Sequence, residues 1–135
     1  MLFRSAFAGF GNVARALTHI LCDRELELDR EYSLQCKTTA IATGGHGCII
    51  SKDGIDLLEA AALVERGGEL GKLPRSIGVH DPLKLIENCD ADVLLETTSL
   101  NVIDGEPAVT YIRTALARGI HVITTNKGPI AFRLP

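Results

Sequence analysis

The sequence predicts an α/β fold built on a doubly wound, mostly parallel sheet. Short runs rich in apolar and β-branched residues alternate with longer segments whose apolar residues recur at helical spacing. This alternation is typical of βαβ units, in which right-handed helical crossovers join parallel strands. Gly9, Gly11 and Ala14 add a G-x-G-x-x-A motif at the first strand-to-helix corner, which is typical of Rossmann-like folds. With 135 residues, 46% of them hydrophobic and 23% charged, the chain is expected to form one domain over residues 1–135.

The small residues of the motif answer separate physical needs. The first strand ends in Ala6-Phe7-Ala8, and Gly9 then allows a tight turn. Gly11 lets the backbone approach a pyrophosphate, and Ala14 allows close packing of the helix on the strand. The free N–H groups of the new helix would face an anion. The residues expected to form the apolar face of this helix are Val13, Leu17, Ile20 and Leu21.

The middle of the chain predicts one further strand and two helices. Residues 23–31 carry many charges of both signs, which indicates a solvated helix end and loop. Residues 33–43 are rich in β-branched residues and predict a strand, which a glycine-rich loop at 43–47 ends. Helices are expected over 54–65, with Gly67-Gly68 as the stop signal, and over 82–87.

The last third of the chain predicts two more strands around a helix. Residues 92–98 form a compact apolar run, as expected for a strand buried on both faces of a parallel sheet. Asp104 can cap the next helix, and Gly119 can end it. A last strand over 121–125 runs into residues 126–129. The stripe of the intervening helix is Ala108, Ile112, Ala115 and Leu116.

The topology also sorts the polar residues by the end of the sheet at which they lie. The segments 9–14, 43–46, 97–99 and 126–127 all follow a strand, so they should line one crevice outside the carboxyl ends of the strands. His121 begins its strand and is expected as a surface residue at the opposite edge. The residues expected to bind a cofactor are Gly9, Phe10, Gly11, Asn12, Val13, Ala14, Thr43, Thr97, Thr98, Ser99, Asn126 and Lys127.

Composition excludes several other kinds of protein. The formal net charge of −3 and a pI near 5.8, with scattered basic residues, argue against nucleic-acid binding. The sequence has neither an apolar run long enough for a bilayer nor the pattern of a signal peptide, so a cytoplasmic location is expected and membrane binding is not. The four cysteines are widely spaced and the four histidines dispersed, so we predict no metal site and reduced, mostly buried thiols.

These segments together resemble the homoserine dehydrogenases. The resemblance rests on Gly-Phe-Gly-Asn-Val-Ala at 9–14, Val-Leu-Leu-Glu-Thr-Thr at 93–98 and Asp-Gly-Glu-Pro-Ala at 104–108. It rests above all on residues 115–129, which are similar to that family's "aL-x-x-G-x-hV-x-T-x-NK-x-P" segment. The resemblance covers nearly the whole chain but only the nucleotide-binding half of such an enzyme. It therefore implies the N-terminal part of a larger protein, with the substrate domain missing.

The resemblance also implies an activity and roles for residues. Homoserine dehydrogenases interconvert L-homoserine and L-aspartate 4-semialdehyde with NAD(P), and the full-length form is expected to be a homodimer. Residues 9–14 would hold the pyrophosphate and residues 97–99 the nicotinamide ribose. Asn126 and Lys127 would reach the nicotinamide and the small-molecule substrate, with Lys127 as the candidate catalytic residue. The 135-residue chain alone is expected to be inactive.

The sequence leaves the choice of cofactor and the role of the domain open. Residues 43–46 offer no carboxylate for the ribose 2′-hydroxyl of NAD, which favours NADP. His46 and Lys52 are candidates for a 2′-phosphate, and Asp53 could be a helix cap. The alternative functions are a non-catalytic NAD(P)-binding regulatory module and an interaction domain with a vestigial nucleotide fold, which would bind no cofactor.

Overall fold

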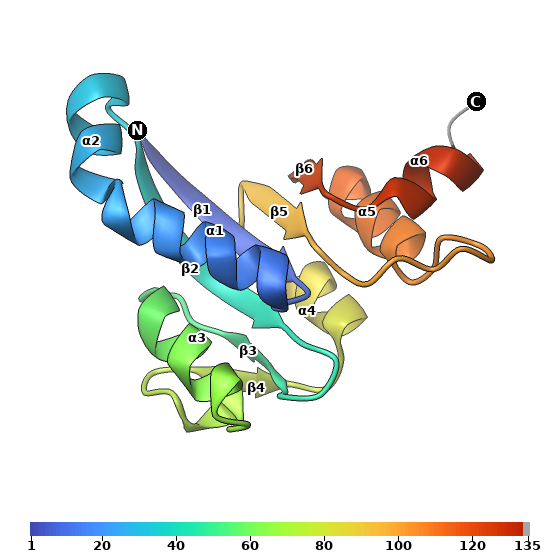
Figure 1. Cartoon of the computed structure of the whole chain (residues 1–135), viewed down its shortest axis with the longest axis horizontal. Coiled ribbons are helices and arrows are strands. Elements are labelled where there is room, and N and C mark those ends of the chain that lie inside the picture. The colour runs from blue at the N-terminus through green and yellow to red at the C-terminus, as the bar shows by residue number, and fades with distance from the viewer. Residues whose placement is uncertain (134–135) are drawn as a thin grey trace.

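The computed structural model describes residues 1–133, which form a six-stranded sheet with helices on both faces (Figure 1). The strand order is β4-β3-β2-β1-β5-β6. Strands β1, β2, β5 and β6 are mutually parallel, while β3 and β4 add an antiparallel edge. The α/β, mostly parallel and doubly wound fold predicted from the sequence is therefore confirmed. The strands are β1 (Leu2–Ala8), β2 (Gln35–Ala42), β3 (Cys48–Ile50), β4 (Ile77–Val79), β5 (Val93–Glu96) and β6 (His121–Thr124).

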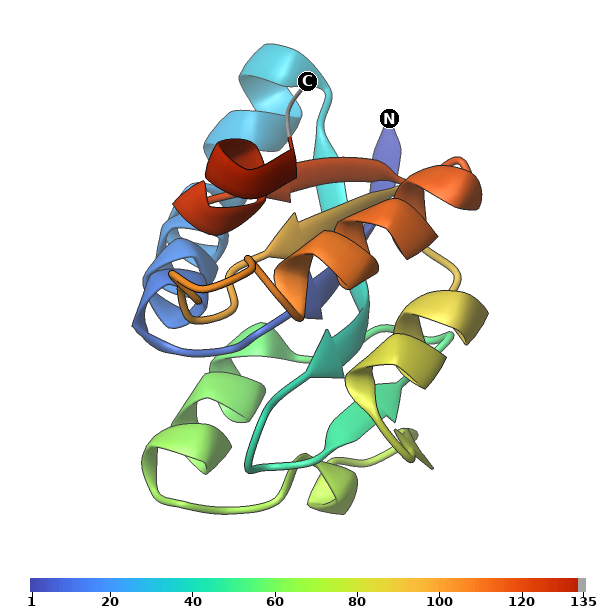
Figure 2. The same cartoon turned by 90° about the vertical axis from the view of Figure 1, so that its right-hand side faces the viewer.

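The helices cover the two faces of the sheet in separate groups. Figure 2 shows α1 and α3 on one side of the strands and α4 and α5 on the other. This arrangement follows from the right-handed crossovers, because β1–α1–β2 and β5–α5–β6 move in opposite directions along the sheet. The helices are α1 (Asn12–Asp23), α2 (Glu25–Tyr32), α3 (Leu57–Glu65), α4 (Pro82–Asn88), α5 (Ala108–Ala117) and α6 (Lys127–Arg133), with a 3₁₀ turn at Leu70–Lys72.

The core has a different composition on each side of the sheet. On the side of α1 and α3, the central strands present the large residues Phe7, Ile41 and Leu95. On the side of α4 and α5, β1 and β2 present only small residues, so these helices can approach the sheet closely. These small residues are Ala6, Ala8, Ala40 and Ala42, all fully buried.

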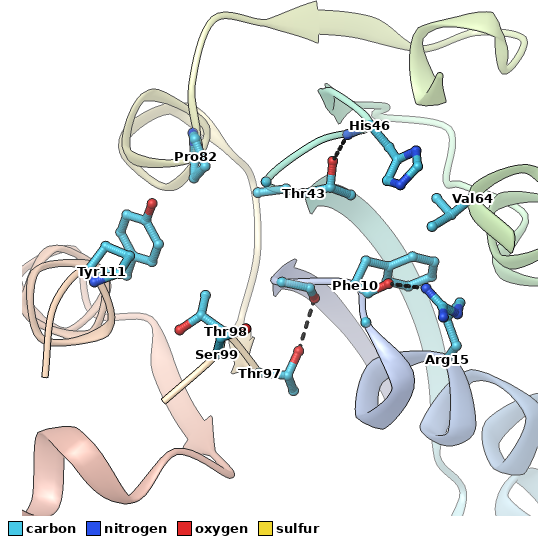
Figure 3. A pocket seen from close by; sticks show the side chains of 15 residues that line it. Phe10, Arg15, Thr43, His46, Val64, Pro82, Thr97, Thr98, Ser99 and Tyr111 are labelled. Carbon is cyan, nitrogen blue, oxygen red and sulfur yellow. Dashed lines mark hydrogen bonds between the residues drawn. The ribbon is translucent and has the colours of Figure 1, made fainter. Parts of the chain in front are cut away.

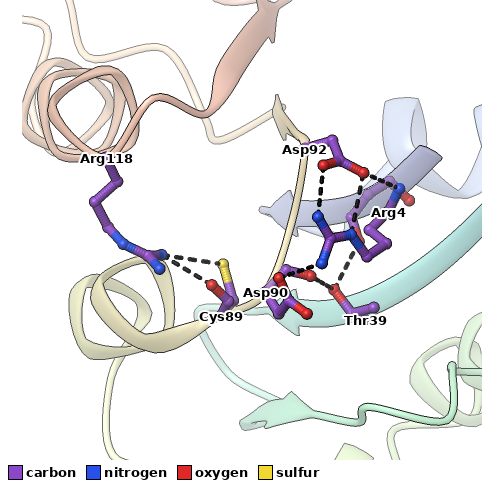
Figure 4. A network of polar contacts seen from close by, with 7 residues as sticks. Arg4, Thr39, Cys89, Asp90, Asp92 and Arg118 are labelled. Atoms are coloured by element: carbon purple, nitrogen blue, oxygen red, sulfur yellow. Dashed lines mark hydrogen bonds and ion pairs between the residues drawn. The ribbon is translucent and has the colours of Figure 1, made fainter.

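A network of charges closes the amino-terminal edge of the sheet (Figure 4). Arg4 donates from Nη2 to Asp92 Oδ1 at 2.7 Å and from Nε to Asp92 Oδ2 at 3.1 Å, and it also pairs with Asp90. These bonds hold the pKa of the Asp92 carboxyl below its usual value. Arg118 donates to the carbonyls of Ile86 at 2.6 Å and Cys89 at 2.9 Å, which joins α5 to the end of α4. His121 is exposed at this edge, as predicted.

Residues 25–32 form a separate helix, so the expectation of a loop there was wrong. None of the residues that α2 contains is buried, and Leu28 is half-buried. Glu25 and Glu27 lie in its first turn and Arg30 in its last, and both placements favour the helix dipole. The charge pattern thus predicted correctly that the segment is exposed to solvent, but it did not predict its helical conformation.

Three short elements were not predicted. Strands β3 and β4 contain three residues each, too few for a period-2 pattern to be visible. Helix α6 was also missed, because residues 126–129 were expected only as the segment after the last strand; Pro129 lies in the first turn of this helix, where proline is tolerated.

The buried faces of two helices differ from those expected. In α1, Ala14 and Thr18 are buried, whereas Val13 and Ile20 are 52% and 54% exposed. Ala14 therefore packs the helix closely on the sheet, as the motif requires.

Asp104 does not cap α5, because the helix begins after Pro107. Instead Glu106 Oε2 accepts from Thr110 N at 3.0 Å, while Asp104 accepts from the Glu106 N–H within the loop. In α5, Ala108 and Ala115 are buried, but Leu116 is 57% exposed.

The four cysteines are free thiols, but only Cys48 and Cys89 are buried. Cys22 is half-buried and Cys36 is exposed, so the expectation of mostly buried thiols holds for two of them. Among residues 1–133, no helix has the length and apolar character needed to cross a bilayer.

Candidate functional site

A cavity of about 450 Å³ opens at the carboxyl edge of the sheet (Figure 3). It lies at the point where the strand order reverses, because β1 leads to β2 on one side and β5 leads to β6 on the other. Ligands of open α/β sheets bind at such switch points. The walls come from the loops after β1, β2 and β5 and from α1, α3, α4 and α5. The lining residues are Gly9, Phe10, Gly11, Arg15, Ala42, Thr43, Gly44, His46, Val64, Pro82, Thr97, Thr98, Ser99, Pro107 and Tyr111.

Gly9 is required by close contact with the loop after β5. Its φ is +90°, and a Cβ atom at this position would lie 2.8 Å from the carbonyl carbon of Thr97 and 2.9 Å from Thr98 N. Thr97 N donates to Ala8 O at 2.8 Å, and Thr97 Oγ1 donates to Gly9 O at 3.0 Å. Hydrogen bonds and close backbone packing therefore join the turn after β1 to the loop after β5.

Gly11 has the opposite surroundings. Among the described residues, no atom lies within 4 Å of the position that its Cβ would take, so the space above it belongs to the cavity. Gly11 is also the N-cap of α1, which has no side-chain cap within residues 1–133 and no acidic residue in its first turn. By contrast, α3 and α4 are capped by Asp56 and Asp81. The first N–H groups of α1 thus remain available for an anion in the cavity.

Arg15 is a cavity residue that the sequence analysis missed. It donates from Nη1 to Phe10 O at 3.0 Å and from Nη2 to Asn12 Oδ1 at 3.1 Å, and its Nε lies 3.7 Å from Glu65 Oε1. These contacts hold the guanidinium across the turn (Figure 3). An arginine one position after the motif was the signal that could have found it.

The end of β2 contributes a second basic group. Thr43 Oγ1 donates to Gly47 O at 2.7 Å and accepts from His46 N at 2.8 Å, which orders the glycine-rich loop. His46 Nδ1 lies 2.9 Å from Gly68 O, so Nδ1 carries a proton. His46 lines the cavity as expected for a candidate phosphate contact, but Lys52 does not. Of the lining residues, all within 1–133, none is an aspartate or a glutamate.

Pro82 and Tyr111 lie on the wall opposite Arg15 (Figure 3), and Pro107 also lines the cavity; all three were missed. They stand near the starts of α4 and α5, far in sequence from the glycine motif. Burial raises the pKa of the Tyr111 phenol, which keeps it protonated.

The structure brings most, but not all, of the expected site residues to the cavity. Asn12, Val13 and the buried Ala14 lie outside the lining, although the N–H groups of all three belong to the start of α1. Asn126 is buried and Lys127 is exposed at the first position of α6, and neither lines the cavity. Asn126 Nδ2 lies 3.4 Å from the carbonyl oxygen of Thr98, which is a residue of the cavity lining. The expected residues in the lining are Gly9, Phe10, Gly11, Thr43, Thr97, Thr98 and Ser99. Within residues 1–133, no three His, Cys, Asp or Glu side chains are grouped so as to hold a metal ion.

The fold, the glycine turn and the cavity at the switch point define a Rossmann-like nucleotide-binding domain. No family model matches the sequence. Over 131 residues the chain is 37% identical to an NAD(+)-dependent homoserine dehydrogenase of Pseudomonas canavaninivorans, covering 96% of this chain and 37% of that protein. Over 123 residues it is 35% identical to a homoserine dehydrogenase of Methanocaldococcus jannaschii, covering 91% of this chain and 36% of that protein. Over nearly its whole length the chain is therefore similar to homoserine dehydrogenases.

Solved structures give the same relationship. A hyperthermophilic archaeal homoserine dehydrogenase in complex with NADPH superposes with a TM-score of 0.77 at 29% identity, covering 97% of this chain and 38% of that one. The chain thus spans a little over one third of the length of these relatives.

Proposed function

We propose that residues 1–135 are the cofactor-binding domain of an NAD(P)-dependent homoserine dehydrogenase, which oxidises L-homoserine to L-aspartate 4-semialdehyde. The observation that carries the proposal is the open space above Gly11, which lies beside the uncapped start of α1 at the switch point of the sheet. The named activity of the relatives and the NADPH in a structural neighbour support it.

In this proposal the dinucleotide lies along the cavity from the loop after β2 to the loop after β5. The pyrophosphate rests on the N–H groups of residues 11–14, where the helix dipole favours negative charge. Thr43 lies at the adenosine end, and residues 97–99 meet the nicotinamide ribose. Ser99, which lines the cavity there, carries a hydroxyl group that can both donate and accept.

The basic residues of the cavity favour NADP over NAD. Arg15 and His46 line it together with no acidic side chain, an environment suited to a 2′-phosphate. The relatives include both an NAD(+)-dependent protein and one in complex with NADPH, so the family uses both cofactors.

Lys127 is the proposed catalytic residue. When bound, the nicotinamide would take up the hydride from the alcohol carbon of the substrate. Lys127 would help to remove the hydroxyl proton from a position close to the nicotinamide. It follows Asn126, which lies against the cavity wall at Thr98. Hydride transfer also needs a bound substrate, so we propose that the remaining length of the relatives supplies the substrate groups, in a cytoplasmic homodimer.

A calorimetric titration of the chain with NAD, NADP and their reduced forms tests the cofactor site. Gly11→Val should abolish binding, because the side chain would fill the space above the turn, while the extended backbone of Gly11 accepts valine. Gly78→Val is the matched control, since Gly78 is an exposed strand glycine with no atom within 4 Å of its Cβ position among the described residues. Unchanged affinity in a folded Gly11→Val protein would refute the placement.

A further inference from the structure

Glu96 is a buried carboxylate that the proposed function does not use. It is the last residue of β5 and is fully buried, after the apolar residues Val93, Leu94 and Leu95. A carboxylate at such a position is costly unless donors surround it. Its register partners are Ala8 on β1 and Thr124 on β6, which places it under the carboxyl edge of the sheet.

The donors around Glu96 come from the two segments that follow β5 and β6. Oε1 accepts from Thr98 N at 2.9 Å and also from the Thr98 hydroxyl. Oε2 accepts from Thr124 Oγ1 at 2.6 Å. No ion pair of Glu96 is found within residues 1–133, so hydroxyl and amide donors alone satisfy it there.

The network continues from Glu96 to Asn126. Thr124 Oγ1 accepts from Asn126 N at 3.0 Å, and Asn126 Nδ2 lies 3.4 Å from both Thr98 O and Thr98 Oγ1. Asn126 Oδ1 accepts from Gly128 N at 3.1 Å, inside the first turn of α6. The 5% exposed side chain of Asn126 is therefore held between Thr98 and Gly128 and braces the junction of β6 and α6.

We infer that Glu96 is a positioning residue, which fixes the loop 97–99 and the Asn126-Lys127 junction relative to each other around the nicotinamide end of the cofactor. The inference rests on the proposed function. Because the Glu96 carboxylate bonds both segments through separate oxygens, loss of either bond leaves the two segments joined by the longer contacts between Asn126 and Thr98. The pyrophosphate turn lies outside this network and keeps its own contacts with Thr97 and Ala42.

The test compares a complete dinucleotide with ADP, which carries the adenosine and pyrophosphate but not the nicotinamide. In Thr124→Val, which keeps the shape of the side chain but removes the bridging hydroxyl, NADPH should bind about tenfold more weakly and ADP with unchanged affinity. The fluorescence shift of NADPH on binding should also diminish. Thr124→Ser should restore both properties, because it retains the hydroxyl.

Thr114→Val is the matched control, because among the described residues that half-buried hydroxyl bonds only to Thr110 O within α5. Equal losses for NADPH and ADP in folded Thr124→Val, or no loss for either, would overturn the positioning role while leaving the cofactor site intact. A wild-type chain that binds neither ligand would overturn the proposed function, and the inference with it.

Discussion

The close approach of the Thr97–Thr98 peptide to Gly9 leads to a quantitative prediction about stability. Gly9→Ala combines two penalties, a side chain at a φ of +90° and a Cβ atom 2.8 Å from a backbone carbon. A left-handed conformation costs a non-glycine residue roughly 1–2 kcal/mol. Forcing an atom into a packed site typically costs about 1–3 kcal/mol more. Because backbone rather than a flexible side chain must move, we expect a total loss of roughly 2–5 kcal/mol in the free energy of unfolding.

Gly67→Ala isolates the first of these penalties. Gly67 has a φ of +78°, but no described atom lies within 4 Å of its Cβ position, so this variant should lose only roughly 1–2 kcal/mol. Urea denaturation of both variants measures the difference at an unchanged m-value. If Gly9→Ala is no less stable than Gly67→Ala, the loop after β5 does not pack against the turn as described.

Three further outcomes are expected. The depressed pKa of Asp92 means that its bonds with Arg4 stabilise the fold above the unfolded-state pKa of about 4 and that this contribution is lost as the pH falls below it. Asp92→Asn should therefore be less stable than the wild type at neutral pH, and thermal melts should show the gap closing in acid; a gap that widens would contradict this. Arg15→Ala should weaken NADP binding about tenfold relative to NAD, as titration with both would show, and an equal loss for both would remove the 2′-phosphate role. With homoserine and NADP the 135-residue chain should give no change in reduced-nicotinamide absorbance, whereas a longer natural form should turn over and lose roughly a hundredfold or more in rate on Lys127→Ala; full activity of that variant would exclude the catalytic role.

The sequence predicted best those features that depend on local chemistry. The turn at 9–14, the strand at 93–96 and the glycine stop at Gly119 could be placed because turn conformation and buried apolar runs leave direct marks on residue types. The loops at the carboxyl edge followed from the parallel topology alone. Resemblance to a known family then supplied the roles of individual residues.

The features that the sequence did not predict depend on tertiary contacts or on very short elements. Tyr111 and Pro82 reach the cavity only because α4 and α5 pack against the same face of the sheet. Glu96 lay inside an apolar run, and its partner Thr124 is 28 residues away, so no local pattern linked them. Arg15 follows the motif by one residue, but the sequence analysis assigned it no role.

The small side chains on the α4 and α5 side of the sheet set the width of the cavity. Ala8 and Ala42 end β1 and β2 and belong to the apolar cluster against which Tyr111 packs, and Ala42 also lines the cavity. A larger residue at either alanine would push α4 and α5 away from the strands. The distance between the strands and these helices, and with it the width of the cavity, therefore depends on the small size of the alanines. Residues that make no polar contact with a ligand can therefore influence which ligands fit, because they determine the width of the cavity.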